Sequence, residues 1–270
     1  ARRVPGGSGW YGPLLLRQAL ACSYNIPAVW LAQQVGTDSV VETAKIMGIT
    51  SLEDTTYGLS LALGSASVSL LDMTYAFSVF ANNGVMIGTE VPESAQVEGL
   101  RTLDPVCILE VRDANGNLLY QYDEPTKKSV ISSEVAFLVT DILSDNSARA
   151  QAFGVDNELV LEDRPVAAKT GTTNDYHDAW TVGFTPQYVV GVWVGNSDYT
   201  EMKNASGVRV AAPIWNNLMT WLHEDLPVES FTRPPGIVTE VIDSTSGKLP
   251  TEYSASLKQE LFIEGTLPTE

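Results

Sequence analysis

The chain has 270 residues, of which 44% are hydrophobic, so it can bury the core of one large domain or of two small ones. Its formal net charge is −17, and a field of that sign repels nucleic-acid phosphates and anionic lipid headgroups. The sequence therefore argues against a nucleic-acid partner. No apolar run reaches the roughly 18 to 20 residues that span a bilayer, and residues 1–23 lack the basic-then-apolar order of a signal peptide.

Cysteines and histidines are scarce. Cys22 and Cys107 are too few for a disulfide framework or a zinc site, and a single bridge between them stays open. His177 and His223 cannot form a multi-histidine centre, and neither has a cysteine or a His-x-x-x-His partner near it in the sequence. We therefore expect no metal and no cofactor.

The first third of the chain has the apolar spacing of helices. Pro27 suits a first helical turn, and Gly36 suits the end of the same helix. Ser23, Tyr24 and Asn25 then fall in the tight joint between the first two helices. The expected helices cover residues 14–22, 27–35, 38–47 and 70–84.

Capping residues support two of these helices. Thr37 is the expected N-cap of the third helix, which Gly48 ends, and Ser69 with Asp72 resembles a capping box for the fourth. The small residues of 57–69 predict a linker that lies close against its neighbours.

The middle of the chain predicts a β-hairpin. Two alternating runs flank Asn115-Gly116, which is a strong signal for a tight hairpin turn. The flanks, residues 89–99 and 123–130, predict loops, so we expect an excursion of about residues 95–128 from the main body. Residues 132–146 then predict a helix capped by Ser132 or Ser133.

The last part predicts a sheet and a covering helix. Three strands in succession, at 164–173, 178–186 and 188–196, have short connections and should be antiparallel neighbours. Residues 212–224 predict an amphipathic helix over one face of that sheet. The tail that follows is rich in Pro, Thr and Ser, with one possible strand at 236–243 and no evident chemistry.

Lys169 interrupts an apolar strand and raises the question of a binding site. Its ammonium would lie next to the Gly171 peptide, which a substrate can approach closely, and Thr170, Thr172 and Thr173 add hydroxyl donors. This combination suits a substrate carboxylate that lies along the strand edge. Taken alone, the Lys-Thr-Gly triplet is more often a solvated strand-end charge followed by a turn glycine, because three-residue matches arise by chance in many proteins.

Two short motifs in order give a more specific signal. Ser23-x-Asn25 lies in a helix joint, where alone it would be a helix cap, and Lys169-Thr-Gly follows Ser23 by 146 residues on the first of three strands. This arrangement resembles the penicillin-recognising serine transpeptidases. The stretches "ALACSYNIPAVWLAQQVG", "SLALGSASVSLLDMTYAFSVFANNGV", "AAKTGTTNDYHDAWTVGFTP" and "VVGVWVGNSD" resemble the transpeptidase domain of class A, bifunctional penicillin-binding proteins.

The resemblance implies an α+β fold of the serine β-lactamase/transpeptidase type, with a helical lobe at about residues 11–81 and an antiparallel sheet covered by helices. It assigns residues 1–226 to a partial transpeptidase domain and 227–270 to a C-terminal tail. The family's first motif, Ser-x-x-Lys, does not occur, because no lysine of the chain has a serine three residues before it. We expect that motif upstream of Ala1, together with the nucleophile-bearing helix and two strands, so the isolated chain should have an unpaired sheet edge.

The resemblance also implies a reaction and its partners. The family's serine attacks the stem-peptide end D-Ala-D-Ala of peptidoglycan, and the acyl-enzyme is resolved by an amine of a second stem peptide. β-Lactam antibiotics mimic that end. The site would work outside the cytoplasmic membrane, anchored by a segment that this chain does not contain.

Individual roles follow residue by residue from the same resemblance. Ser23 would relay protons to the leaving amine, Asn25 would hydrogen-bond the substrate backbone, and Lys169 would supply positive potential. Thr170 and Thr172 would bind the terminal carboxylate, and the Thr172 N–H would be one of two oxyanion donors. Four further residues would either border the groove or only pack and turn: Tyr24, His177, Asp178 and Trp180.

Two alternatives stay open. The chain could be a non-catalytic module that binds stem peptides or β-lactams, or part of a related D,D-carboxypeptidase or β-lactamase. The inserted hairpin and the Thr172-Thr173 pair fit the class A transpeptidases better by resemblance. A Ser-x-x-Lys upstream would favour the enzyme over the binding module.

Overall fold

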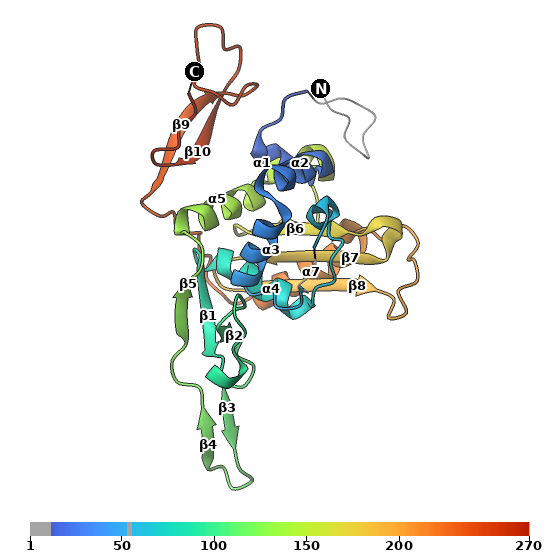
Figure 1. Cartoon of the computed structure of the whole chain (residues 1–270), viewed down its shortest axis with the longest axis vertical. Helices are drawn as coiled ribbons and strands as arrows, with labels where there is room; N and C mark the ends of the chain where they lie inside the picture. Colours follow the sequence, from blue (N-terminus) through green and yellow to red (C-terminus); the bar gives the residue numbers. More distant parts are fainter. Residues whose placement is uncertain (1–11, 53–55, 270) are drawn as a thin grey trace.

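A helical lobe forms the first part of the chain, as the apolar spacing predicts (Figure 1). The computed structural model describes residues 12–52 and 56–269, so the predicted start of the lobe at Tyr11 lies outside the described residues. A 3₁₀ turn, Leu59–Leu63, occupies the predicted small-residue linker. The helices of the lobe are α1 (Leu16–Ala21), α2 (Asn25–Val35), α3 (Thr37–Ile46) and α4 (Leu70–Ala81).

The predicted caps are partly confirmed. Ser69 Oγ accepts a hydrogen bond from the Asp72 N–H at 3.0 Å, and Ser132 Oγ accepts one from the Val135 N–H at 3.3 Å. The expected cap by Thr37 is wrong, since Thr37 is the first residue of α3 and makes no side-chain cap bond. Gly36, with φ +90°, both ends α2 and precedes α3, so the backbone reverses there without a capping side chain.

A buried carboxylate ties α4 to two other segments. Asp72 Oδ2 accepts hydrogen bonds from the Thr50 N–H at 2.9 Å and the Ser51 N–H at 3.2 Å, while Oδ1 meets Arg101 Nη1 at 2.6 Å. Burial raises the pKa of Asp72, but the hydrogen bonds from Arg101 and Thr50 outweigh it and hold that pKa below its usual value. The network fixes the segment after α3 and the Arg101 segment against one helix.

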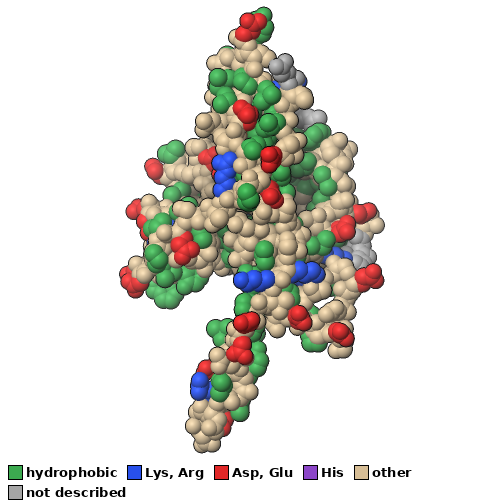
Figure 2. Space-filling model, turned by 90° about the vertical axis from the view of Figure 1, so that its left-hand side faces the viewer, with side chains coloured by type: hydrophobic (Ala, Val, Ile, Leu, Met, Phe, Trp, Pro, Cys, Tyr) green, Lys and Arg blue, Asp and Glu red, His purple; other side chains and the backbone are tan. Residues whose placement is uncertain are grey.

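The middle of the chain forms a small sheet and a projecting hairpin. The hairpin pairs β3 with β4 around Gly116, which has φ +84°, as the Asn-Gly signal predicts. It extends from the body as the narrow projection at the bottom of Figures 1 and 2. The elements of this region are β1 (Val85–Glu90), a 3₁₀ turn (Glu93–Ala95), β2 (Leu103–Asp104), β3 (Glu110–Arg112), β4 (Leu118–Gln121) and β5 (Thr126–Ser129).

The prediction of a loop at residues 123–130 is wrong, because it contains β5. This strand pairs antiparallel with β1 in the register Val85↔Ser129 to Gly88↔Thr126, in a sheet of order β2-β1-β5. Its sequence, Thr-Lys-Lys-Ser, has no apolar alternation, and its side chains are mostly exposed. Pairing with a distant strand determines its structure, which local propensity does not capture.

Two helices precede the main sheet. α5 (Ser133–Ser144) was predicted, whereas α6 (Asn146–Phe153) was not. Asp145 separates them and caps α6, since its Oδ1 accepts a hydrogen bond from the Ala148 N–H at 2.9 Å. The polar sequence of α6 gives little apolar periodicity, which is why the pattern did not indicate a helix.

The main sheet has the predicted three antiparallel strands, in the order β6-β7-β8. Ala167 packs with Leu143 of α5 and Phe184, whereas Ala168 packs with Trp215 on the opposite face. Thus α4 and α5 cover one face and α7 the other. The elements are β6 (Ala167–Thr172), a 3₁₀ turn (Asn174–Tyr176), β7 (Asp178–Phe184), β8 (Val189–Gly195), a π-helical turn (Gly207–Ala211) and α7 (Ala212–Leu222).

The C-terminal tail forms a two-stranded antiparallel sheet instead of a single strand. β9 (Ile237–Asp243) was predicted, but its partner β10 (Leu257–Ile263) was missed. β10 begins Leu-Lys-Gln-Glu, and a long Ser-rich connection, residues 244–256, separates it from its pairing partner, so no short hairpin signal marks it. Cys22 is buried, Cys107 is exposed, and both are free. Within the described ranges, no helix has the length and apolarity needed to cross a membrane.

Arg17 anchors this tail to the helical lobe. Its guanidinium binds the Glu260 carboxylate of β10, and it also meets Asp141 Oδ2 at 2.6 Å and Asp145 Oδ2 at 3.3 Å. Arg17 is 8% exposed. Burial raises the pKa of Glu260, but the hydrogen bond from Arg17 outweighs it and keeps that pKa below its usual value. One side chain thus joins α1, the α5–α6 corner and the tail.

We expect Arg17→Met to lower the free energy of unfolding by about 2 kcal/mol, less than for a fully buried pair, because its carboxylate partners are partly exposed. Urea denaturation measures this loss. Arg112→Met is the control, since Arg112 pairs with Glu110 on the exposed hairpin, where solvent screens the pair, and its loss should change the stability little. Equal losses in both variants would contradict the anchoring role.

The stabilisation that Arg17 provides should depend on pH. The lowered pKa of Glu260 means that its contribution is complete above the unfolded value of 4.5 and is lost as pH falls through the folded value. The stability difference between Arg17→Met and the parent chain should therefore shrink below pH 4.5.

Candidate active site

The joint between α1 and α2 presents two of the predicted site residues to solvent. Ser23 has φ +58°, a left-handed conformation that costs a residue with a Cβ about 1 kcal/mol. The Ser23 N–H donates to Leu20 O at 3.1 Å, and the Tyr24 N–H donates to Ala19 O at 3.0 Å. This reversal leaves Ser23 and Asn25 exposed and Tyr24 buried. Tyr24 therefore packs in the core beside Cys22 instead of lining an open groove.

The structure brings Ser23 and Lys169 together from opposite ends of the sequence. Lys169 Nζ donates a hydrogen bond to Ser23 Oγ at 2.6 Å and another to Thr170 O at 2.8 Å. Lys169 lies on the same face of β6 as Ala167, which is the face that α4 and α5 cover. The fold thus brings polar atoms of the two motifs, which are 146 residues apart in the sequence, into direct contact.

The environment of Lys169 favours its neutral form. Burial and the positive charge of Arg149 lower the pKa of Lys169 to about 8. A substantial fraction of this amine is therefore unprotonated near pH 8, whereas an ordinary lysine remains a cation. At the site, Lys169 can both donate a proton and accept one from Ser23.

Asn25 is the first residue of α2, two residues beyond Ser23, and is exposed. Within the described part of the chain, its side-chain amide makes no hydrogen bond. Its amide is therefore available to a ligand.

Thr170, Gly171 and Thr172 lie on the edge strand β6 beside the π-helical turn. Thr172 Oγ1 accepts a hydrogen bond from the Gly207 N–H at 2.9 Å, and this bond does not use the hydroxyl proton. A Cβ on Gly207 would lie 2.5 Å from Trp180 O and 2.6 Å from Gly171 O. Only glycine lets the turn approach the motif strand this closely. Sequence reasoning did not identify Gly207.

Thr173 closes the turn after the motif. Its Oγ1 accepts a hydrogen bond from the Asp178 N–H at 2.7 Å and donates toward Asp178 Oδ2 at 3.3 Å. Asp178 Oδ1 in turn accepts from Trp193 Nε1 at 2.8 Å. Thr173 and Asp178 therefore hold β6, β7 and β8 together at this end of the sheet. Trp180 faces its cross-strand neighbours Gly171 and Trp193.

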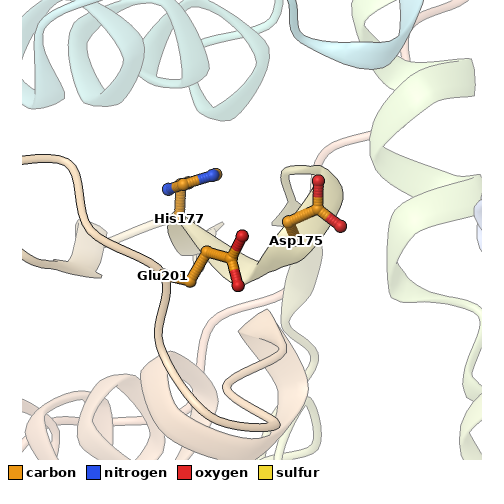
Figure 3. A group of neighbouring side chains, drawn as sticks. All are labelled: Asp175, His177 and Glu201. Carbon is orange, nitrogen blue, oxygen red and sulfur yellow. The ribbon is translucent and has the colours of Figure 1, made fainter.

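His177 lies in a small polar cluster with Asp175 and Glu201, shown in Figure 3. Their ligand-type atoms all lie within 4.8 Å of one another, so they could contribute to binding a divalent cation. Sequence spacing did not indicate this group, because Glu201 comes from a separate loop. The His177 ring stacks on Tyr199 at 4.3 Å, and Nδ1 meets Tyr199 O at 2.8 Å. These contacts already explain the ring's orientation, and we assign no metal to the cluster.

Comparison with known proteins shows the family to which the chain is similar. The family model of the penicillin-binding protein transpeptidase domain matches residues 7–220, and that of the penicillin-binding protein 1A C-terminal domain matches residues 233–270. The chain belongs to the penicillin-binding protein transpeptidase family. The second match overlaps the C-terminal sheet, for which the sequence alone suggested no role.

Relatives in this family are penicillin-binding proteins 1A. That of Clostridium botulinum is 31% identical over 97% of this chain, and that of Aquifex aeolicus is 36% identical over 96%. These matches cover 30% and 32% of the relatives, so the chain spans about a third of their length. The structure of penicillin-binding protein 1A from Haemophilus influenzae matches with a TM-score of 0.76 and 26% identity, over 100% of this chain and 44% of the other.

A more distant structure shares the fold alone. The penicillin-binding protein PonA1 from Mycobacterium tuberculosis matches with a TM-score of 0.69 and 23% identity, over 87% of this chain and 62% of that one. The predicted α+β transpeptidase fold is confirmed.

The close approach at Gly207 gives a test of the site's architecture. We expect Gly207→Ala to destabilise the chain by about 2 kcal/mol, because the new Cβ meets two backbone oxygens that cannot move aside freely. Thermal unfolding measures the loss. Gly58→Ala is the control, since the nearest atom to a Cβ there is Ser60 Oγ at 4.0 Å. A Gly207→Ala chain as stable as that control would contradict the packing described.

Proposed function

We propose that this chain is the part of a peptidoglycan D,D-transpeptidase domain that carries the second and third motifs of the site, and that β-lactams acylate the complete domain. The observation that carries the proposal is the 2.6 Å contact between Lys169 Nζ and Ser23 Oγ. Two motif residues that are far apart in the sequence meet in the geometry that proton transfer requires. The nucleophile of the first motif, Ser-x-x-Lys, would come from outside these 270 residues.

Each residue has a proposed role. Ser23 passes a proton toward the leaving amine, with Lys169 as its hydrogen-bonded partner. Asn25, exposed at the start of α2, binds the amide backbone of the substrate. Thr170 and Thr172, with the Gly171 peptide between them, bind the terminal carboxylate along the edge of β6. Thr173 supports this edge through Asp178, since its hydroxyl is already engaged there.

The proposed ligands are stem peptides that end in D-Ala-D-Ala, and β-lactams. A structure of PonA1, which has this fold, contains penicillin V, and one of penicillin-binding protein A from Mycobacterium tuberculosis is an imipenem acyl-enzyme complex. Because the substrate lies in the cell wall, we also propose that the domain works on the outer side of the cytoplasmic membrane. No cofactor is required by this mechanism, which uses only side-chain hydroxyls, an amide and an amine.

The first test is intact-mass spectrometry after treatment with penicillin. We expect the 270-residue chain to remain unmodified and a version extended upstream by about a hundred encoded residues, the scale of a small domain, to gain the mass of the drug. The matched control is the extended version with its motif serine replaced by alanine. If neither length gains mass but both bind penicillin reversibly, the chain is part of a binding module instead.

A second test concerns the motif residues themselves. In the extended protein, Lys169→Met and Ser23→Ala should each slow acylation by penicillin at least about a hundredfold, the typical contribution of a positioned proton-transfer group. Stopped-flow measurement of acylation gives the rates. Lys127→Met, on the exposed strand β5, is the control and should acylate at the parent rate. Parent-like rates in both motif variants would refute the assigned roles.

A further inference from the structure

Arg149 of α6 is an unusual buried cation. It is 2% exposed, and its guanidinium donates to two backbone carbonyls, Leu143 O at the end of α5 and Ala168 O of β6 at 3.4 Å. Its buried Nε makes no hydrogen bond within the described part of the chain. It also forms no ion pair with any described carboxylate. Among the described residues, the hydrogen-bond partners of the Arg149 guanidinium are thus peptide carbonyls.

A buried cation without an ion-pair partner lowers the stability of the fold. A buried charge without a paired counter-charge is destabilising, and an apolar side chain of similar size could fill the same space. Asp145 is an acidic residue whose charge acts on Arg149, but its carboxylate is engaged with Arg17, Ser147 and the N–H of Ala148. Burial lowers the pKa of Arg149 to about 10, with Asp145 opposing, so the guanidinium is still charged at neutral pH.

The guanidinium of Arg149 contacts β6, the strand that carries the Lys-Thr-Gly motif. Ala168, whose carbonyl it holds, directly precedes Lys169. Two contacts of Lys169 are with neutral atoms, Ser23 Oγ and Thr170 O, and Arg149 is the charged group that acts on its amine. Charged side chains on the other elements packed against β6 are engaged elsewhere or exposed: Asp141 pairs with Arg17, Asp178 accepts from Trp193, Glu134 lies against Gly236, and Arg209 is exposed.

We propose that Arg149 is a positioning residue for Lys169: its buried guanidinium holds the β6 backbone at Ala168 O and places a positive charge beside the strand that carries the Lys169 amine. A neutral amine at 2.6 Å can accept the proton of the Ser23 hydroxyl, which leaves an ammonium beside a serine oxygen that is ready to take a proton from elsewhere. The use of this proton relay rests on the proposed function. The effect of Arg149 on Lys169 is a property of this chain and can be measured without it.

Competitive labelling with isotopic acetic anhydride tests the first part on the 270-residue chain. Only neutral amines react, so the rate for the Lys169 peptide, followed by mass spectrometry against pH, gives its titration. We expect a midpoint near 8, the value to which the pKa of Lys169 is lowered. A midpoint near 10.4, the ordinary range of lysine, would overturn the proposal even if no variant can be purified.

Variants then assign the effect to Arg149. In Arg149→Met, the labelling rate of Lys169 at pH 8 should fall about fivefold, as for a tenfold change in proton affinity, whereas Arg149→Lys should stay within about twofold of the parent. Arg233→Met is the matched control, because Arg233 also donates to a carbonyl, Ile237 O at 2.8 Å, but in the tail. Circular dichroism checks that each variant is folded.

The outcomes distinguish the effect of the Arg149 charge from that of its side-chain packing, and both from the proposed function of the domain. Parent-like labelling in Arg149→Met overturns the proposal, and so does an equal fall in Arg149→Lys, which would show that shape and not charge matters. Penicillin acylation of the extended protein is scored separately. If acylation fails while the labelling results hold, the proposed function is wrong and the coupling of Arg149 to Lys169 stands.

Discussion

Packing of α4 and α5 against the β6-β7-β8 sheet is the constraint on which the candidate site depends. Ala167 and Phe184 of the sheet are fully buried against Leu143 of α5 and the aromatic side chains of α4. Side chains alternate along β6, so once Ala167 is fixed on that face, Lys169 must lie on it too, at the point where the helical lobe presents Ser23. A shift of β6 by one residue would move Lys169 to the α7 face and separate the two motifs.

Packing on the other face of the sheet explains why small residues line the motif strand. Thr172 and Gly171 lie against the π-helical turn, and Gly207 is the residue that allows this approach. The turn leads directly into α7, whose Trp215 is completely buried under the opposite face of the sheet. The packing of α7 against the sheet therefore helps to position the π-helical turn beside the proposed ligand edge of β6, and a substitution in the α7 core would alter the geometry at Thr172.

The sequence predicted those parts of the structure whose signals are local. Asn115-Gly116 marks a hairpin, the apolar alternation of residues 178–196 marks two strands, and the Ser23 and Lys169 motifs identified a pair that the structure brings to 2.6 Å. Elements that depend on distant partners were missed. β5 is a strand only because β1 lies beside it, and β10 only because β9 does.

Arg149 and Gly207 could not be found from sequence for a related physical reason. An arginine on a polar helix resembles any solvated arginine until the fold buries it, and a glycine before a helix resembles any turn residue until another backbone approaches it. The Arg17 anchor is similar, because its three carboxylates come from α5, the α5–α6 corner and β10. Burial and long-range contact, not residue type, give these side chains their roles.

The net charge of the chain and the local charge at the motif strand have opposite signs. A chain with net charge −17 should repel a ligand that carries a carboxylate. Exposed charges are screened beyond about 8 to 10 Å at physiological ionic strength, however, whereas buried charges are screened much less. Acidic side chains are spread over the visible surface in Figure 2, but Arg149 lies beneath the motif strand and Lys169 on it. In the proposed function, a carboxylate at the edge of β6 therefore lies near the charge of Arg149 and, below the pKa of about 8, also near that of Lys169.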